Sequence, residues 1–311
     1  MTYKNRLYFL CSIIGALVLL YAGSYVFSYE RSNTRTASFV WLDSKLAGRT
    51  SRISINSDGQ SFELVKRSQQ WFVVQNDIEF PARQTRVEDF IGIFTRRAAW
   101  HVRSTSASSH ARLGLGETAS RVTIYGENTV LLDLLLGDDD SSGREINVRR
   151  FAQNEVRSGD NSLRTYVSGQ INSWYNLRLI PESESGNLDA DSVQRLTIYN
   201  DHETQIFTRR NRAWTVSGVN VINPDSSSIE NYIRVILNTE GDNFVDDDEG
   251  IDFFNRIVIE FGNGNVQTIR LSEPDESGRS FAKITGSDYT YSIPSWVLGR
   301  LFRDTESFER Q

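Results

Sequence analysis

The chain has 311 residues, of which 34 are Lys or Arg and 40 are Asp or Glu, and its formal net charge is −6. Its single Cys excludes an intrachain disulfide and a zinc site built from cysteines. The acidic balance argues against nucleic acid as a partner, because neutralising phosphates requires clustered Lys and Arg.

An uncharged apolar run of 21 residues lies near the start of the sequence, at residues 7–27. As a helix with a rise of 1.5 Å per residue it reaches about 31 Å, which matches the ~30 Å hydrocarbon core of a bilayer. Lys4 and Arg6 precede the run and the segment after it is less basic, so the positive-inside rule places the N-terminus in the cytoplasm. We predict a single-pass transmembrane helix that contacts the lipid bilayer through residues 7–27, with the bulk of the protein extracytoplasmic.

A cleaved signal peptide is the alternative interpretation of this run. Its apolar region normally spans about 7–15 residues and ends at an A-x-A-like site. The run here is longer, and Ala22-Gly23-Ser24 resembles such a site only weakly. The sequence therefore favours an uncleaved anchor and leaves cleavage open.

Beyond the anchor, the sequence predicts two modules joined by a polar linker. The predicted parts are the cytoplasmic tip and transmembrane helix at 1–28, a tether and lead-in at 29–50, a first module at 51–180, a linker at 181–192, a second module at 193–303 and a polar tail at 304–311. A domain size of about 100–200 residues is consistent with two modules in this length.

Short segments recur in the same order in the two modules. The clearest pairs are Arg52–Ile55 with Arg195–Ile198, Trp71 with Trp214, Arg121–Ile124 with Arg256–Ile259, and Asp140–Arg144 with Asp275–Arg279. Collinear matches over more than a hundred residues predict an internal duplication.

Each module contains one amphipathic helix, which begins near Thr85 in the first module and near Ser227 in the second. Apolar residues recur there with helical spacing, at Val87, Phe90, Ile91 and Phe94 and at Ile229, Tyr232, Ile233 and Ile236. A Glu three residues after Thr85 and after Ser227 predicts a capping box at each helix start.

Short β-branched and aromatic segments surround these helices and predict strands. In the first module they are Ile53–Ile55, Ser61–Lys66, Trp71–Val74, Ala98–Arg103, Arg121–Tyr125, Val130–Leu136, Glu145–Phe151 and Arg164–Val167, and in the second they are Arg256–Phe261, Val266–Leu271, Ser280–Ile284 and Tyr289–Ser292. Short terminal helices are expected at Ile171–Leu177 and Ser295–Phe302. The predicted class is α+β, with two duplicated and mainly antiparallel β-rich modules.

Two acidic segments are candidate cation sites. The loop at 138–143 has Asp, Asp, Ser and Gly at the first, third, fifth and sixth positions of an EF-hand loop, but Arg149 stands at the twelfth, where a bidentate Glu is required. This pattern favours a solvated hairpin loop. Adventitious binding of divalent cations remains open for it and for the cluster at 246–249.

Other residue types offer no recognisable chemistry. His101, His110 and His202 are scattered, and neither G-x-S-x-G nor G-x-x-x-x-G-K-[ST] occurs. Trp71 and Trp214 hold matching positions, which favours core packing over a ligand platform. We predict a protein that is not an enzyme, with no catalytic, cofactor-binding or metal-binding residue and no cofactor.

Several of these motifs together resemble a bacterial family. An N-terminal membrane helix is followed by Arg-Ile-Ser-Ile, a lone Trp71, a capped helix, Leu113-Gly114-Leu115, the Leu-rich strand at 131–137 and Tyr166-Val167. On these residues, the sequence resembles domain-of-unknown-function family 4340 over most of residues 40–302. In the second module Glu249-Gly250-Ile251 replaces the Leu-Gly-Leu motif.

The resemblance implies a membrane-anchored protein encoded beside ABC transporter genes of the gliding-motility type. It implies the bacterial cytoplasmic (inner) membrane as the location and the membrane subunits of an ABC-type transporter as partners. The leading hypothesis is a non-enzymatic extracytoplasmic accessory subunit of such a complex. A module that binds an envelope glycan or peptide is the alternative, and a hydrolase with an unrecognised carboxylate pair is a third possibility.

Overall fold

The computed structural model describes residues 38–127, 129–180, 189–200, 203–211, 213–218, 224–245 and 248–309, together with Val18 and Tyr21. Apart from these two, the predicted membrane helix at 7–27 lies outside the described residues, as do the tether at 29–37 and most of the linker. Within the part of the protein that is described, no helix is both long and apolar enough to cross a membrane.

The protein divides into two compact units, Met1–Trp174 and Tyr175–Gln311. The prediction placed residues 175–180 in the first module, but their contacts lie in the second unit. The Tyr175 ring packs against Phe244 at 5.1 Å between centroids, and the Leu179 N–H donates to the Thr239 carbonyl. These contacts place the unit boundary before the polar linker.

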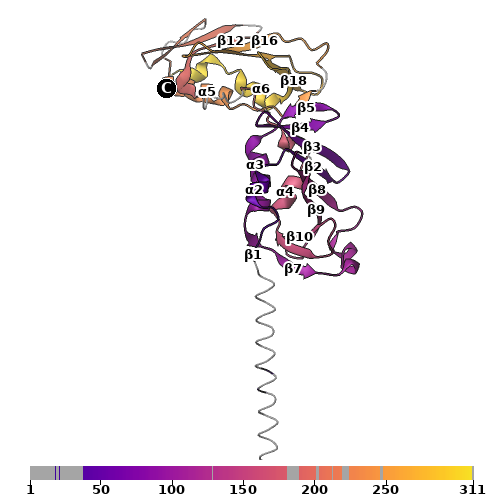
Figure 1. Ribbon diagram of the computed structural model, residues 1–311. Helices are drawn as coiled ribbons and strands as arrows, with labels where there is room; N and C mark the ends of the chain where they lie inside the picture. The colour runs from indigo at the N-terminus through magenta and orange to yellow at the C-terminus, as the bar shows by residue number, and fades with distance from the viewer. Residues whose placement is uncertain are drawn as a thin grey trace, which may run out of the picture. The chain divides into compact units, whose positions relative to one another are not determined.

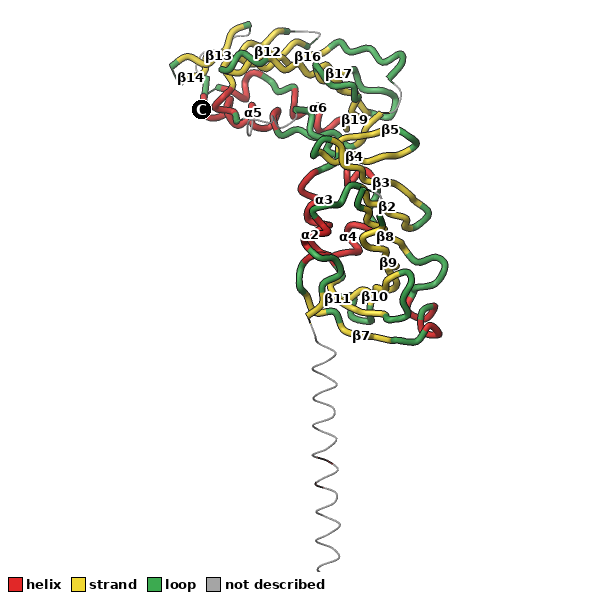
Figure 2. Tube along the Cα trace, in the orientation of Figure 1, coloured by secondary structure: helices red, strands yellow, loops and turns green. Residues whose placement is uncertain are grey.

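The first unit is built on a nine-stranded antiparallel sheet (Figures 1 and 2). Its strands are β2 (Arg52–Ser57), β3 (Gln60–Arg67), β4 (Gln70–Gln75), β5 (Ile78–Pro81), β7 (His101–Ser104), β8 (Ser120–Tyr125), β9 (Val130–Asp139), β10 (Glu145–Arg150) and β11 (Val156–Asp160). They lie in the order β5-β4-β3-β2-β8-β9-β10-β11-β7. A separate pair joins β1 (Ser38–Phe39) to β6 (Ala98–Ala99).

Helices cover one face of this sheet in Figure 1. They are α2 (Ser44–Ala47), α3 (Gln84–Thr95) and α4 (Ser162–Val167), and 3-10 turns lie at Ala107–Ser109, Ala111–Leu113 and Ile171–Trp174. Alternate strand residues such as Ile53 and Ile55 point toward the helices and are fully buried. We call the opposite side of each sheet, to which the intervening strand residues point, the outer face.

The second unit has an eight-stranded antiparallel sheet. Its strands are β12 (Val193–Tyr199), β13 (Thr204–Arg210), β14 (Ala213–Ser217), β15 (Asn243–Val245), β16 (Asn255–Phe261), β17 (Val266–Leu271), β18 (Arg279–Ile284) and β19 (Thr290–Pro294), and its helices are α5 (Ser226–Leu237) and α6 (Ser295–Leu301). The order β14-β13-β12-β16-β17-β18-β19-β15 matches that of the first sheet from β4 to β7, strand for strand. The predicted α+β class with mainly antiparallel sheets is confirmed.

An aromatic residue in a terminal 3-10 turn closes each unit in the same way. The Trp174 carbonyl accepts from the N–H of Arg83, at the start of α3, at 2.8 Å, and the ring packs on Phe90. The Phe308 carbonyl accepts from the N–H of Asp225, at the start of α5, at 2.7 Å. Phe308 belongs to the turn Thr305–Phe308 and is fully buried, so residues 304–309 are part of the folded unit and the predicted polar tail is wrong there.

The helix starts differ from the predicted capping boxes. α3 begins at Gln84, and the side chain of its N-cap residue Arg83 makes no capping bond, whereas the Asp225 carboxylate caps α5 by accepting from the N–H groups of Ser227 and Ser228. The first residue of each helix instead bonds to the backbone of a tryptophan: Gln84 Oε1 accepts from the backbone N–H of Trp71, and Ser226 Oγ accepts from the backbone N–H of Trp214. The helical periodicity correctly placed Val87, Phe90 and Phe94 and their counterparts in α5 on the buried faces. Ile91, predicted on the buried face of α3, is only half-buried, and Ile93 is buried instead.

The strand predicted at Arg164–Val167 is wrong, because this segment lies in α4. Leu163 and Val167 stand four residues apart and are both buried, which is helical spacing. The strand before it is β11, whose Gly159 and Asp160 hid the strand pattern. Gly159 is required there because a Cβ would lie 2.5 Å from the ring of Trp100.

Candidate binding surface

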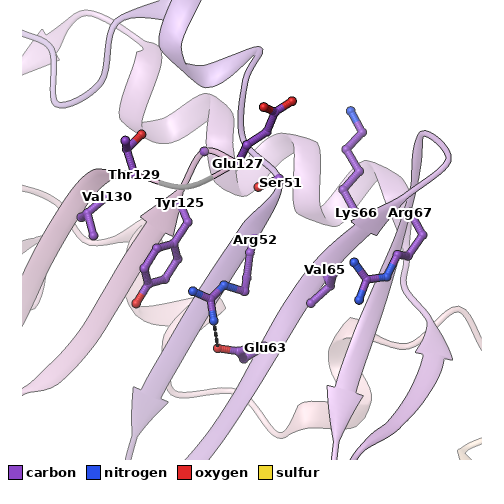
Figure 3. A pocket seen from close by; sticks show the side chains of 11 residues that line it. Ser51, Arg52, Glu63, Val65, Lys66, Arg67, Tyr125, Glu127, Thr129 and Val130 are labelled. Atoms are coloured by element: carbon purple, nitrogen blue, oxygen red, sulfur yellow. Dashed lines mark hydrogen bonds and ion pairs between the residues drawn. The ribbon is translucent and has the colours of Figure 1, made fainter.

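A hollow of about 500 Å³ lies on the outer face of the first sheet, over β2, β3, β8 and the start of β9 (Figure 3). We call it the Arg52 hollow. Strand alternation positions its side chains: the buried Ile53, Leu64 and Ile124 place their neighbours Arg52, Glu63 and Tyr125 on the outer side.

The Arg52 guanidinium is fixed by two neighbours in Figure 3. Its Nη1 donates to Glu63 Oε1 at 2.9 Å, and its Cζ lies 4.0 Å from the centre of the Tyr125 ring, which pairs with Arg52 across β2 and β8. An exposed ion pair of this kind contributes at most about 1 kcal/mol, and a cation–π contact adds about 0.5–1 kcal/mol. These contacts position the charge more than they stabilise the fold.

The rest of the Arg52 hollow offers groups of both charges and one apolar side chain. The Lys66 ammonium stands at the margin of the hollow, because Lys66 pairs with the buried Trp71 on the helix side of β3 and lies 5.9 Å from its ring. Neither this ammonium nor the Glu127 carboxylate forms an ion pair with any described residue. Val130 is 56% exposed. Such a surface can bind a polar chain that carries charges of both signs and an apolar side chain.

The family model for the Domain of unknown function (DUF4340) matches residues 71–252. The protein belongs to this family. The match confirms the resemblance seen in the sequence and extends over parts of both units. No curated protein and no solved structure matches the sequence.

The acidic loop at 138–143 and its counterpart around Asp275 in the second unit are turns, and one carboxylate organises each of them. Asp140 accepts from the hydroxyl of Ser142 and from the N–H groups of Arg144 and Glu145, and these bonds, that of Ser142 foremost, lower the pKa of Asp140 to about 2. Asp275 accepts likewise from the hydroxyl and N–H of Ser277 and from the N–H of Arg279, which lowers its pKa. Each carboxylate therefore accepts hydrogen bonds from hydroxyl and N–H groups of its own loop.

Among the residues that the structure describes, no group of three or more His, Cys, Asp or Glu could hold a metal ion. Asp246 and Asp247 of the second acidic cluster lie outside that part. Asp248 accepts from the Lys283 ammonium and the Thr290 hydroxyl, both at 2.6 Å, and the lysine bond is the main cause of its lowered pKa. Asp248 thus joins its loop to β18 and β19.

One cluster in the first unit combines a serine, a glutamate and a histidine. Ser158 Oγ donates to Glu145 Oε2 at 2.7 Å, and His101 Nε2 lies 3.8 Å from Glu145 Oε1. Ser158 and His101 are paired across β11 and β7, but the Ser158 hydroxyl donates to Glu145 and no hydrogen bond joins it to the imidazole among the described residues. The cluster therefore lacks the bond from serine to imidazole that nucleophile activation requires. The other histidines are apart: His110 contacts the Asn154 carbonyl, and His202 lies outside the described residues.

The two tryptophans at matching positions are core residues, as predicted. Trp71 is 3% exposed and Trp214 is 2% exposed. The prediction named no site residue and therefore missed the Arg52 hollow. A partial signal was present, since the alternation in β2 and β8 turns Arg52 and Tyr125 outward, but the register that joins strands about seventy residues apart is set by tertiary packing.

Proposed function

We propose that this DUF4340 protein is a non-enzymatic, membrane-anchored accessory subunit on the extracytoplasmic side of an ABC-type transport complex in the bacterial inner membrane. The apolar run at 7–27 supports the anchor, and the family resemblance supports the transporter as a partner. The observation that carries the proposal is the Arg52 hollow, whose charges are held in place but not buried. Such groups suit recognition of a polar partner surface.

We also propose that the two units are copies of one ancestral module. The shared strand order, the matched positions of Trp71 and Trp214, and the closure of each unit by Trp174 or Phe308 support it. Arg195 stands at the place of Arg52 but faces Glu260 at 3.8 Å, where the first unit has the Tyr125 ring, so the two surfaces differ.

The test is copurification of the full-length protein after gentle detergent extraction of membranes. We expect transporter membrane subunits in the eluate, and we expect Arg52→Ala to reduce their yield while Arg195→Ala, the matched change in the second unit, does not. Recovery of the protein alone, under conditions in which the transporter subunits stay intact, would contradict the proposal.

The alternative, a module that binds an envelope peptide or glycan, is favoured by the exposed Val130 beside Tyr125 in the same hollow. It predicts that the full-length protein retains peptidoglycan fragments or envelope peptides when no transporter subunit is present. Loss of this retention on Tyr125→Ala would place the ligand in the Arg52 hollow.

A further inference from the structure

A second hollow, of about 490 Å³, lies farther along the outer face of the first sheet. The residues used below line it: Asn56, Leu115, Glu117, Arg121, Leu135 and Arg149. We call it the Arg149 hollow. It combines an apolar part with basic groups, and neither the family description nor the function proposed above accounts for it.

The Leu-Gly-Leu segment forms the apolar part. Leu115 is 1% exposed and packs with Leu135 of β9 and Val156 of β11 in a small hydrophobic cluster on this face. Gly114 adopts a φ of +71° that turns the backbone toward the sheet, and Gly137 of β9 lets it come close, since a Cβ there would lie 2.1 Å from the Leu113 carbonyl oxygen. The motif that carried the family resemblance therefore builds one wall of this hollow.

The two arginines of the Arg149 hollow differ in their partners. Arg121 is neutralised by Asp133, to which its Nε and Nη2 donate at 3.0 and 2.8 Å. Arg149 has no carboxylate partner among the described residues: its Nη1 donates to carbonyls, including that of Phe151 at 2.7 Å, and its buried Nε has no acceptor. Burial lowers the pKa of Arg149, as expected for a cation whose hydration is only partly replaced.

The strand register sets four of these residues in one row across the sheet. Asn56 of β2 pairs with Arg121 of β8, Arg121 pairs with Leu135 of β9, and Leu135 pairs with Arg149 of β10. The row therefore runs from a small polar residue to a cation, and the apolar Leu135 stands directly beside Arg149.

The matching row of the second unit carries different side chains, which pair across β12, β16, β17 and β18 in the order Tyr199, Arg256, Arg270 and Lys283. The Tyr199 ring lies 3.9 Å from Arg256 Cζ, and the Lys283 ammonium donates to Asp248 at 2.6 Å. The second unit thus has a bulky ring in place of Asn56, a charge in place of Leu135 and a neutralised cation in place of Arg149. The chemistry of the Arg149 hollow belongs to the first unit.

We infer that the Arg149 hollow binds a ligand that carries a carboxylate next to an apolar group, with the carboxylate on Arg149 and the apolar group on Leu115 and Leu135. A guanidinium without a carboxylate partner is matched in charge and geometry by such an anion. Both the C-terminus of a peptide with an apolar last residue and a free apolar acid have this chemistry. Glu117 is exposed at the rim of the hollow.

The test is calorimetric titration of the purified full-length protein in detergent with three probes: N-acetyl-Leu-Phe as the free acid, the same dipeptide as its C-terminal amide, and hexanoate. We expect the acid to bind at least roughly tenfold more tightly than the amide, because the amide loses the charge-assisted bond. Binding of hexanoate as well would identify a simple apolar acid as sufficient, and its failure would identify a peptide C-terminus.

Three variants locate the site. Asn56→Tyr places the second unit's own residue in the hollow and should abolish binding of the acid while leaving unfolding unchanged. Val266→Tyr, which puts the same ring at an exposed position of β17 in the second unit, is the control and should bind as the parent does. Glu117→Gln removes a negative charge from the rim of the hollow and should bind the acid at least as tightly as the parent does. Arg149 also holds the turn after β10, so its replacement alone would not separate binding from folding. Equal binding of acid and amide, or undiminished binding by Asn56→Tyr, would overturn the inference. The measurement uses the purified protein, so its outcome is independent of whether transporter subunits copurify.

Discussion

The two units use one strand order to present different outer faces. In the second, Tyr199 stacks on Arg256 and Arg195 faces Glu260, whereas the first has Asn56 beside Arg121 and an extra wall made by Leu115. The buried sides, in contrast, follow one plan of tryptophan, helix and closing aromatic residue. The comparison teaches that the packed side chains determine the fold of each unit, whereas the solvent-facing strand positions are free to differ between the units.

The largest expected effect comes from the closing aromatic residues. Trp174→Ala should destabilise the first unit and Phe308→Ala the second by about 3–5 kcal/mol each, because loss of a fully buried ring leaves a cavity. Hydrogen exchange resolved by segment would measure this. Each change should raise exchange in its own unit, and equal effects on both units from either change would contradict the division into two units.

The next largest effect concerns the Leu-Gly-Leu wall, which only the first unit has on its outer face. Gly137→Ala should destabilise the first unit by about 1–3 kcal/mol, since the new methyl group would collide with the backbone carbonyl of Leu113. Gly92→Ala is the control, because a Cβ there meets nothing within 4 Å and Ala favours α3 by about 0.5–1 kcal/mol. Denaturant unfolding measures both. A Gly137→Ala protein as stable as the parent would show that the Leu-Gly-Leu wall does not rest on β9.

A smaller effect on stability should distinguish the capped start of α5 from the uncapped start of α3. Asp225→Ala should cost about 1 kcal/mol, because two N–H groups of α5 lose their acceptor. Thr85→Ala, at the position predicted to cap α3, lies inside that helix and removes no cap bond, so it should leave the free energy of unfolding nearly unchanged. Thermal unfolding of the two variants decides this, and equal losses would show that the caps do not distinguish the helices.

The smallest effect concerns the turn carboxylates and depends on pH. The folded-state pKa of Asp140 is about 2, below its ordinary value of 3.8, so its stabilising contribution is present above that ordinary value and is lost as the pH falls through about 2. Asp140→Asn should therefore be less stable than the parent at neutral pH, and the difference should shrink toward pH 2. Asp275→Asn should behave likewise in the second unit. Urea unfolding across this pH range measures both, and a difference independent of pH would assign the effect to the turn geometry alone.

Much of the buried architecture could be predicted from the sequence. Helical spacing identified the faces of α3 and α5, and most strands were placed, because apolar periodicity reports burial directly. The prediction failed where local signals were weak. β11 was not predicted because Gly159 and Asp160 are unusual in strands. The core residue Phe308 was assigned to a polar tail because the residues around it are polar. The two hollows could not be predicted, since they depend on which outward-facing residues the strand register brings together.

Site-specific photocrosslinking in cells tests the central proposal most directly. A photoreactive residue in place of Val130, which is exposed in the Arg52 hollow, should crosslink to a membrane subunit of an ABC-type transporter, and the same residue in place of the exposed Val266 on β17 is the matched probe of the second unit. We predict a transporter adduct from position 130, and we expect Arg52→Ala to weaken it. Membrane-bound protein that forms no such adduct from position 130, while the transporter is present and intact, would contradict it.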